Sequence, residues 1–190
     1  MPPPTPPPPP VSGVIPRPAA PNAPTVPPKG PEGAFLVELL VYNGSPFKDH
    51  WAYFVRSNTA PSKGVVLHAT GDVRNGFKFE IKRAYDLDET NRKPDRIPLQ
   101  WVDARYFDER AMFNNGVAML DTVPVCRFEA SAHKVKAPGK SLNSTDKKAA
   151  PGRRLVQRDC QTWIVESADQ LVAEGIFNTE IATYLHEIQQ

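Results

Sequence analysis

Cysteine and long apolar runs are both scarce in this sequence, and each scarcity excludes a class of protein. Only two of the 190 residues are cysteine, Cys126 and Cys160, and no Cys-x-x-Cys pair occurs. No apolar stretch of about seven residues follows a basic start, as a secretory signal requires. Two thiols in such a chain favour a reducing intracellular compartment over a disulfide framework. No stretch reaches the roughly 18 apolar residues of a membrane span, so we expect an intracellular protein, cytoplasmic or nuclear.

Histidine is scarce as well, and basic charge gathers in one place only. The four histidines, at 50, 68, 133 and 186, are far apart, so the sequence gives little support to a zinc site and we predict no metal. Residues 133–158 hold eight Lys or Arg and one Asp. We interpret about 133–157 as a basic mobile loop, a solvated insertion, with a nuclear-localisation or phosphate-binding patch as the alternative. No interleaved aromatic residues accompany the charge, so nothing favours nucleic-acid binding.

Proline is abundant and confined mostly to one end. Residues 1–32 hold 15 of the 22 prolines and show no apolar periodicity, so they cannot form a core. We predict a disordered tail of polyproline II character over 1–32 and one folded domain over 34–190. The tail also suits the aromatic grooves of polyproline-binding domains, such as profilin or WW domains.

Short apolar segments predict an antiparallel sheet. In 76–85, Phe77, Phe79 and Ile81 alternate with polar residues, which is typical of a half-buried strand. Short turns join this segment to two others, so the three should form a meander. The other expected strands are 34–43, 51–57, 64–71 and, more weakly, 97–104 and 122–132, and 105–115 has the pattern of a short helix.

The end of the chain predicts two helices, and the first begins beside a cysteine. Over 158–177 apolar residues recur at three- and four-residue spacing, and Gly175 is a good terminator. Asp159 is a suitable N-cap, which would make Cys160 the first helical residue. There the helix dipole and free N–H groups favour the nucleophilic thiolate. A shorter helix is expected over 178–189, and the fold class is therefore α+β.

Two histidines on neighbouring strands could serve such a thiol. His50 opens the segment 51–57 and His68 closes 64–71; a metal site, a base for a nucleophile and plain packing are all open. A cysteine at a helix start needs a base, and the base needs an orienting partner. Cys126, expected in mid-strand, is interpreted as inert, and His133 and His186 as surface residues.

The segments HWAYFV, VVLHATG and DCQTW together resemble the circularly permuted papain-like enzymes of the lecithin:retinol acyltransferase and NlpC-related superfamily. The resemblance covers roughly residues 35–177, and the pattern is also similar to that of a group of uncharacterised fungal proteins. It implies a sheet packed against a helix that carries the nucleophile, Cys160, at its N-terminus. It further implies His50 as general base, His68 as its orienting partner, and no metal or organic cofactor. Asp159 and Gln161 stand where the family commonly has Asn and Glu.

This resemblance leads to an expected function. Cys160 would attack an acyl carbon of an amide, ester or thioester and form a thioester, passed to water by a hydrolase or to an amine or alcohol by an acyltransferase. Weaker candidates for substrate binding are Trp51, Gln161 and Trp163, of which the two tryptophans also suit a core. The alternative is a non-catalytic interaction protein that uses residues 1–32.

Overall fold

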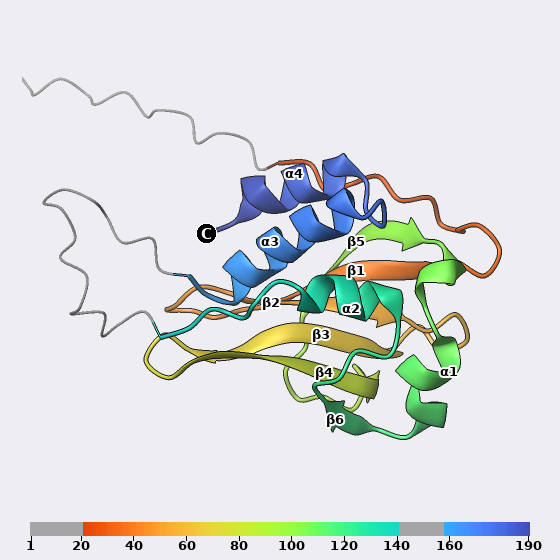
Figure 1. Ribbon diagram of the computed structural model, residues 1–190, viewed down its shortest axis with the longest axis horizontal. Coiled ribbons are helices and arrows are strands. Elements are labelled where there is room, and N and C mark those ends of the chain that lie inside the picture. Colours follow the sequence, from red (N-terminus) through yellow and green to blue (C-terminus); the bar gives the residue numbers. More distant parts are fainter. Residues whose placement is uncertain (1–20, 141–157) are drawn as a thin grey trace, which may run out of the picture.

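An antiparallel sheet of six strands forms the centre of the computed structural model, which describes residues 21–140 and 158–190 (Figure 1). Across the sheet the strands lie in the order β5-β1-β2-β3-β4-β6. The strands are β1 (Phe35–Tyr42), β2 (His50–Arg56), β3 (Lys63–Asp72), β4 (Gly76–Asp86), β5 (Asp95–Val102) and β6 (Met119–Asp121). The expected meander is confirmed, because β2, β3 and β4 are consecutive neighbours.

Alternation along the strands divides the buried residues between the two faces of the sheet. On β2, Trp51, Tyr53 and Val55 belong to the main core, whereas Ala52 and Phe54 belong to a smaller cluster. Successive side chains of a strand point to opposite faces, so the two clusters lie on opposite sides of the sheet. By the same rule His50 shares a face with Ala52 and Phe54.

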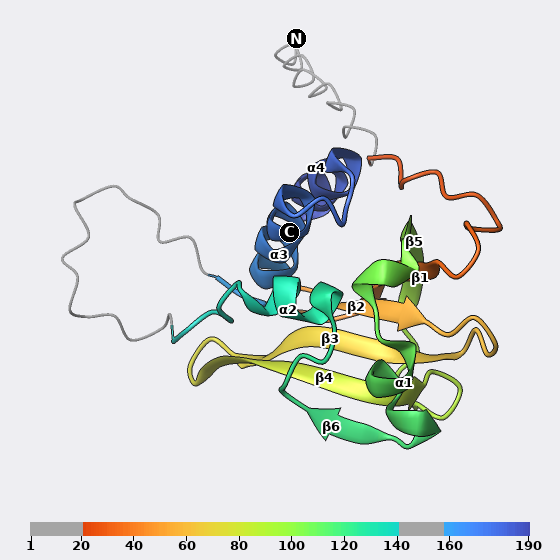
Figure 2. The same ribbon diagram turned by 45° about the vertical axis from the view of Figure 1, so that its right-hand side comes forward.

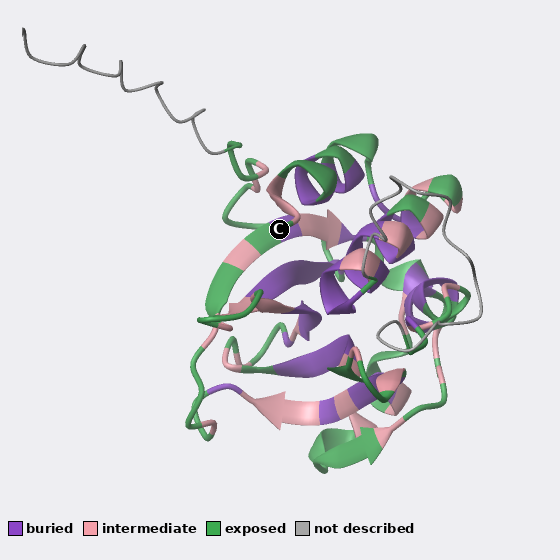
Figure 3. Cartoon of the chain, turned by 90° about the vertical axis from the view of Figure 1, so that its left-hand side faces the viewer, coloured by how far each residue is buried: buried purple, intermediate pink, exposed green. Residues whose placement is uncertain are grey.

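Helices cover the face that carries the main core. The helices α2 (Arg127–His133), α3 (Cys160–Ala173) and α4 (Thr179–Ile188) all lie on one side of the sheet (Figure 2). The helix α3 packs on β2 and β3, and α4 packs on α3. Buried residues gather where these helices meet the central strands (Figure 3). The α+β fold class and the start of α3 at Cys160 are confirmed.

The predicted strand over 122–132 is wrong, because most of this segment forms α2. Cys126 is the N-cap of that helix and not a mid-strand residue. The fully buried Glu129 accepts a hydrogen bond from the Val125 amide at 2.8 Å and pairs with Arg83 Nη1 of β4 at 2.9 Å. The ion pair with Arg83, which is distant in the sequence, stabilises this segment as a helix. Residues 105–115 do not form one helix but lie in three short helical pieces. These are η1 (Ala104–Tyr106), α1 (Glu109–Met112) and η2 (Asn114–Gly116).

The described part of the proline-rich segment lies against the domain. Trp101 of β5 donates from Nε1 to the Pro27 carbonyl at 2.9 Å, and a Cβ at Gly30 would meet the Trp101 ring at 2.2 Å. The predicted tail over 1–32 therefore contacts the fold near its end; residues 1–20 and most of the predicted basic loop, 141–157, lie outside the described residues. Within the described ranges, no helix is both long and apolar enough to cross a membrane.

Candidate functional site

The first turn of α3 presents Cys160 at a fully capped helix start. Asp159 Oδ1 accepts hydrogen bonds from the Gln161 amide at 3.0 Å and from the Thr162 amide at 3.1 Å, and Thr162 Oγ1 accepts one from the Asp159 amide. This reciprocal capping box confirms Asp159 as the N-cap. The other carboxylate oxygen, Oδ2, pairs with Lys48 Nζ at 3.0 Å. The negative charge beside Cys160 is therefore shared among two amides and an ammonium group.

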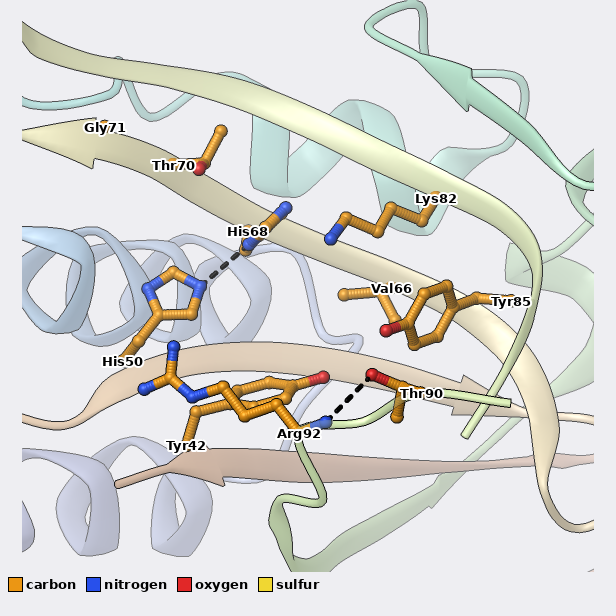
Figure 4. Close-up of a pocket in the computed structure, with 10 residues that line it drawn as sticks. All are labelled: Tyr42, His50, Val66, His68, Thr70, Gly71, Lys82, Tyr85, Thr90 and Arg92. Atoms are coloured by element: carbon orange, nitrogen blue, oxygen red, sulfur yellow. Dashed lines mark hydrogen bonds between the residues drawn. The ribbon is translucent and has the colours of Figure 1, made fainter. Parts of the chain in front are cut away.

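His50 and His68 meet in a hydrogen-bonded chain that ends on a carboxylate. His50 Nε2 lies 2.8 Å from His68 Nδ1 (Figure 4). His68 Nε2 lies 3.2 Å from Glu80 Oε1. A carboxylate can only accept hydrogen bonds, and the other oxygen of Glu80, Oε2, lies 3.5 Å from Lys78 Nζ. His68 must then donate from Nε2 and accept at Nδ1. His50 consequently donates from Nε2, which leaves its Nδ1 with a free lone pair.

The start of α3 sits where β2 and β3 separate. Pairing between these strands runs only from Tyr53 to Arg56 on β2, although β2 begins at His50. At the unpaired end, the Asp49 carbonyl accepts from Gln161 Nε2 at 2.9 Å and lies 3.9 Å from Cys160 Sγ. The Trp51 amide acts on the thiol as well, by lowering its pKa. The sulfur therefore lies beside the backbone next to His50, although within the described ranges no hydrogen bond joins it to either imidazole.

Burial sets the protonation state of all three groups. Burial and the neighbouring His68 lower the pKa of His50 from 6.5 to about 4. Burial also lowers the pKa of His68, an effect that Glu80 opposes. Burial raises the pKa of the Cys160 thiol; the Trp51 amide opposes this rise and the Asp159 carboxylate adds to it. The expected lowering of the thiol pKa is thus wrong for the resting structure, because Cys160 is only 8% exposed and burial outweighs the helix dipole.

A pocket of about 480 Å³ opens beside the histidine pair on the face away from α3 (Figure 4). His50 and His68 line it together with mostly polar or cationic residues of β1, β3, β4 and the following loop: Tyr42, Val66, Thr70, Gly71, Lys82, Tyr85, Thr90 and Arg92. Cys160 is not among the lining residues. The candidate binding residues Trp51, Gln161 and Trp163 do not line it either, because their side chains are buried in the domain.

Three residues of the site were missed by sequence reasoning. In the sequence, Glu80 has the position of a solvent-facing residue in an alternating strand, but in the structure its side chain is buried against His68. Asp49 and Gln190 hold Gln161: Gln190 Oε1 accepts from the Asp49 amide at 2.9 Å and from Gln161 Nε2 at 3.1 Å. The alternating pattern on β4 indicates the face on which Glu80 lies, but not its contact with His68. No local signal joins Asp49 and Gln190, which are 141 positions apart.

The other singled-out residues lie away from the site. Burial raises the pKa of Cys126 to about 12, which agrees with an inert thiol. His133 and His186 are exposed; the first packs on Phe79 and the second pairs with Asp169 at 3.1 Å. In residues 21–140 and 158–190, no group of three or more His, Cys, Asp and Glu side chains is arranged to hold a metal ion.

Comparison with known proteins places both histidines, Glu80 and Cys160 within the match to one family. No curated protein and no solved structure matches the chain. The family of unknown function DUF6540 matches residues 37–178, a span that contains His50, His68, Glu80 and Cys160. With about three quarters of its length in that match, from β1 to the end of α3 and just beyond, the chain belongs to DUF6540.

Proposed function

We propose that the chain is a cysteine-dependent acyl hydrolase or acyltransferase of the permuted papain-like type, with Cys160 as nucleophile and His50 as general base. The observation that carries the proposal is the polarity of the His50–His68–Glu80 chain, which leaves Nδ1 of His50 as the free acceptor. The thiol lies 3.9 Å from the Asp49 carbonyl, directly before the same residue, and the Trp51 amide directly after that residue lowers the thiol pKa. A nucleophile, a base and an orienting group are thus supplied by one helix start and two strands.

The proposed reaction passes two protons through His50, one in each half of the reaction. Nδ1 of His50 takes the thiol proton while Sγ of Cys160 attacks the carbonyl carbon, and the carbonyl oxygen becomes an anion. We assign the Cys160 and Trp51 amides, both beside the sulfur, as donors to that oxyanion. When it collapses, the bond to the alcohol, amine or thiol leaving group breaks, and His50 protonates the leaving group. Water or an acceptor then attacks the Cys160 thioester, His50 takes its proton, and Sγ receives that proton on release.

The proposed mechanism starts from neutral partners and not from a thiolate–imidazolium pair. The pKa of His50 is lowered to about 4, and the pKa of Cys160 is raised. At neutral pH the imidazole is therefore unprotonated and the thiol is protonated. Proton transfer must accompany the attack, so His50 acts as a general base within the reaction step. His68 and Glu80 are positioning residues, because they act on the substrate only through His50.

Acylation with p-nitrophenyl acetate tests this proposal without knowledge of the substrate. We expect one acetyl group on Cys160 of the folded protein, detected by intact mass and peptide mapping and removed by neutral hydroxylamine. His50→Ala should slow acylation about a hundred-fold, the usual worth of a general base, and Cys126→Ser should leave it unchanged.

Iodoacetamide labelling of the same proteins gives a second readout. Cys160 should react before Cys126, whose pKa is raised to about 12. Labelling of Cys126 first, or an unchanged Cys160 rate in His50→Ala, would overturn the Cys–His assignment.

A further inference from the structure

We propose that the pocket beside His50 binds the anionic end of the substrate, a carboxylate or a phosphate group. This inference rests on the proposed function, because it names the substrate class of the same site. The lining contains two basic side chains, Lys82 of β4 and Arg92 of the loop before β5. A pocket of about 480 Å³ has room for a small organic anion next to the imidazoles.

The two cations converge on the histidine pair. The ammonium group of Lys82 extends from β4 toward His68, and the guanidinium group of Arg92 extends along Tyr42 toward His50 (Figure 4). Lys82 Nζ lies 5.3 Å from the centre of the Tyr85 ring, and Arg92 Cζ lies 5.5 Å from that of Tyr42. The aromatic faces hold the long side chains in place, so both positive groups point inward from opposite walls.

Neither cation has an acidic partner in the part of the chain that the structure describes. Most other basic groups near the sheet do: Lys63 pairs with Asp86 at 3.6 Å and Lys78 with Glu80 at 3.5 Å. Arg92, by comparison, donates a hydrogen bond to the Asn43 carbonyl at 2.5 Å and packs over the Tyr42 ring. Two unpaired cations in a half-enclosed pocket favour an anion of the ligand as their partner.

Because nearby positive charges affect the pKa of His50, a change in this pKa should report the binding of an anion. Lys82 and Arg92 both contribute to its lowered pKa, after burial and His68. Glu80 is the acid that contacts the pair, through His68. Burial raises the pKa of the Tyr42 phenol to about 12, so this group is neutral near pH 7. An anion between the two cations would cancel part of their field. The pKa of His50 should therefore rise from about 4 toward its ordinary value when the anion binds.

Imidazole NMR of the full chain measures this effect without catalysis. Butyrate and methyl phosphate are the two anionic probes, and butyramide is the neutral one. We expect saturable shifts of the His50 and His68 signals with an anion but not with butyramide, together with a rise in the His50 pKa. The His133 and His186 signals, on other surfaces, should stay in place. The probe that binds more tightly tells whether the site takes a carboxylate or a phosphate.

Charge-removing variants locate the site. Lys82→Gln and Arg92→Gln should each weaken binding about ten-fold, the effect of one charge-assisted hydrogen bond. Arg74→Gln removes the same charge from the exposed turn between β3 and β4 and should change nothing. Equal response to butyramide, or unchanged affinity in both pocket variants, would overturn the anion site. Because no turnover is measured, a saturable anion response supports the pocket even if Cys160 fails the acylation test.

Discussion

At the scale of single residues, the direction of each hydrogen bond decides which nitrogen can act as a base. Glu80 fixes that direction: its carboxylate accepts from His68 Nε2, so His68 accepts from His50 and leaves His50 Nδ1 free. An amide in place of the carboxylate could donate to His68 instead and reverse the chain. The proposed role of His50 as a base thus depends on a residue that it does not touch.

The variant Glu80→Gln tests this dependence. We expect acylation of Cys160 by p-nitrophenyl acetate to fall about ten-fold, the worth of one charge-assisted hydrogen bond. Asp169→Asn is the matched control, because it removes the carboxylate from the remote His186–Asp169 pair. Glu80→Asp should recover part of the rate. An unchanged rate in Glu80→Gln would mean that the acid does not orient the pair.

At the scale of elements, the strands could be predicted more fully than the helix α2. The strands from β1 to β4 alternate, or form short apolar runs between turns, and both are local signals. The segment 122–132 looks equally strand-like, but Glu129 and its partner Arg83, 46 residues apart, make it a helix. The candidate site divides in the same way. His50, His68 and Cys160 stand out by type and order, whereas Glu80, Asp49 and Gln190 are recognised only by contact.

The cap of α3 joins stability to reactivity, and substitutions of Asp159 separate the two. Asp159→Ala should lower the free energy of unfolding by about 1 kcal/mol, because two amides lose their acceptor. Asp159→Asn can still cap, so its stability in urea denaturation should change by only a few tenths of a kcal/mol. Both variants remove a negative charge that raises the thiol pKa. The pH at which Cys160 reacts half-maximally with iodoacetamide should therefore fall in both; a rise would contradict the assigned role of the charge.

The buried ion pair between β4 and α2 should be the most sensitive link between elements. Arg83 and Glu129 are 1% and 0% exposed, and their atoms lie 2.9 Å apart. Glu129→Gln leaves the guanidinium group with only Asp121 as an acid partner, so we expect about 3 kcal/mol less stability in urea. Glu187→Gln on the exposed face of α4 should change stability by less than about 0.5 kcal/mol. Equal effects of the two variants would show that the buried pair contributes nothing.

At the scale of the whole molecule, the sheet has one face covered by helices and one face that carries the pocket. The helices bury the first face, and the second carries the smaller apolar cluster beside the pocket. The start of α3 connects the two, because its thiol lies beside the start of β2, which pairs with β1 but not with β3. Keeping the two buried histidines neutral has a cost for the fold, which should be visible in the response of its stability to pH.

Acid should destabilise the fold through the histidine pair. The pKa of His50 is about 4 in the folded chain and 6.5 as its ordinary value, and the pKa of His68 is lowered too. Between these values the unfolded chain binds more protons, so stability is complete above about pH 6.5 and is lost as the pH falls toward 4. For His50 the loss is on the order of 2 kcal/mol. Urea denaturation at neutral pH and near pH 4.5 should therefore show a smaller acid loss in His50→Gln than in the unsubstituted chain, whereas the exposed His133→Gln should follow the unsubstituted chain. Parallel curves for all three proteins would show that His50 is protonated as easily in the folded state as in the unfolded one, and the neutral base of the proposed mechanism would lose its support.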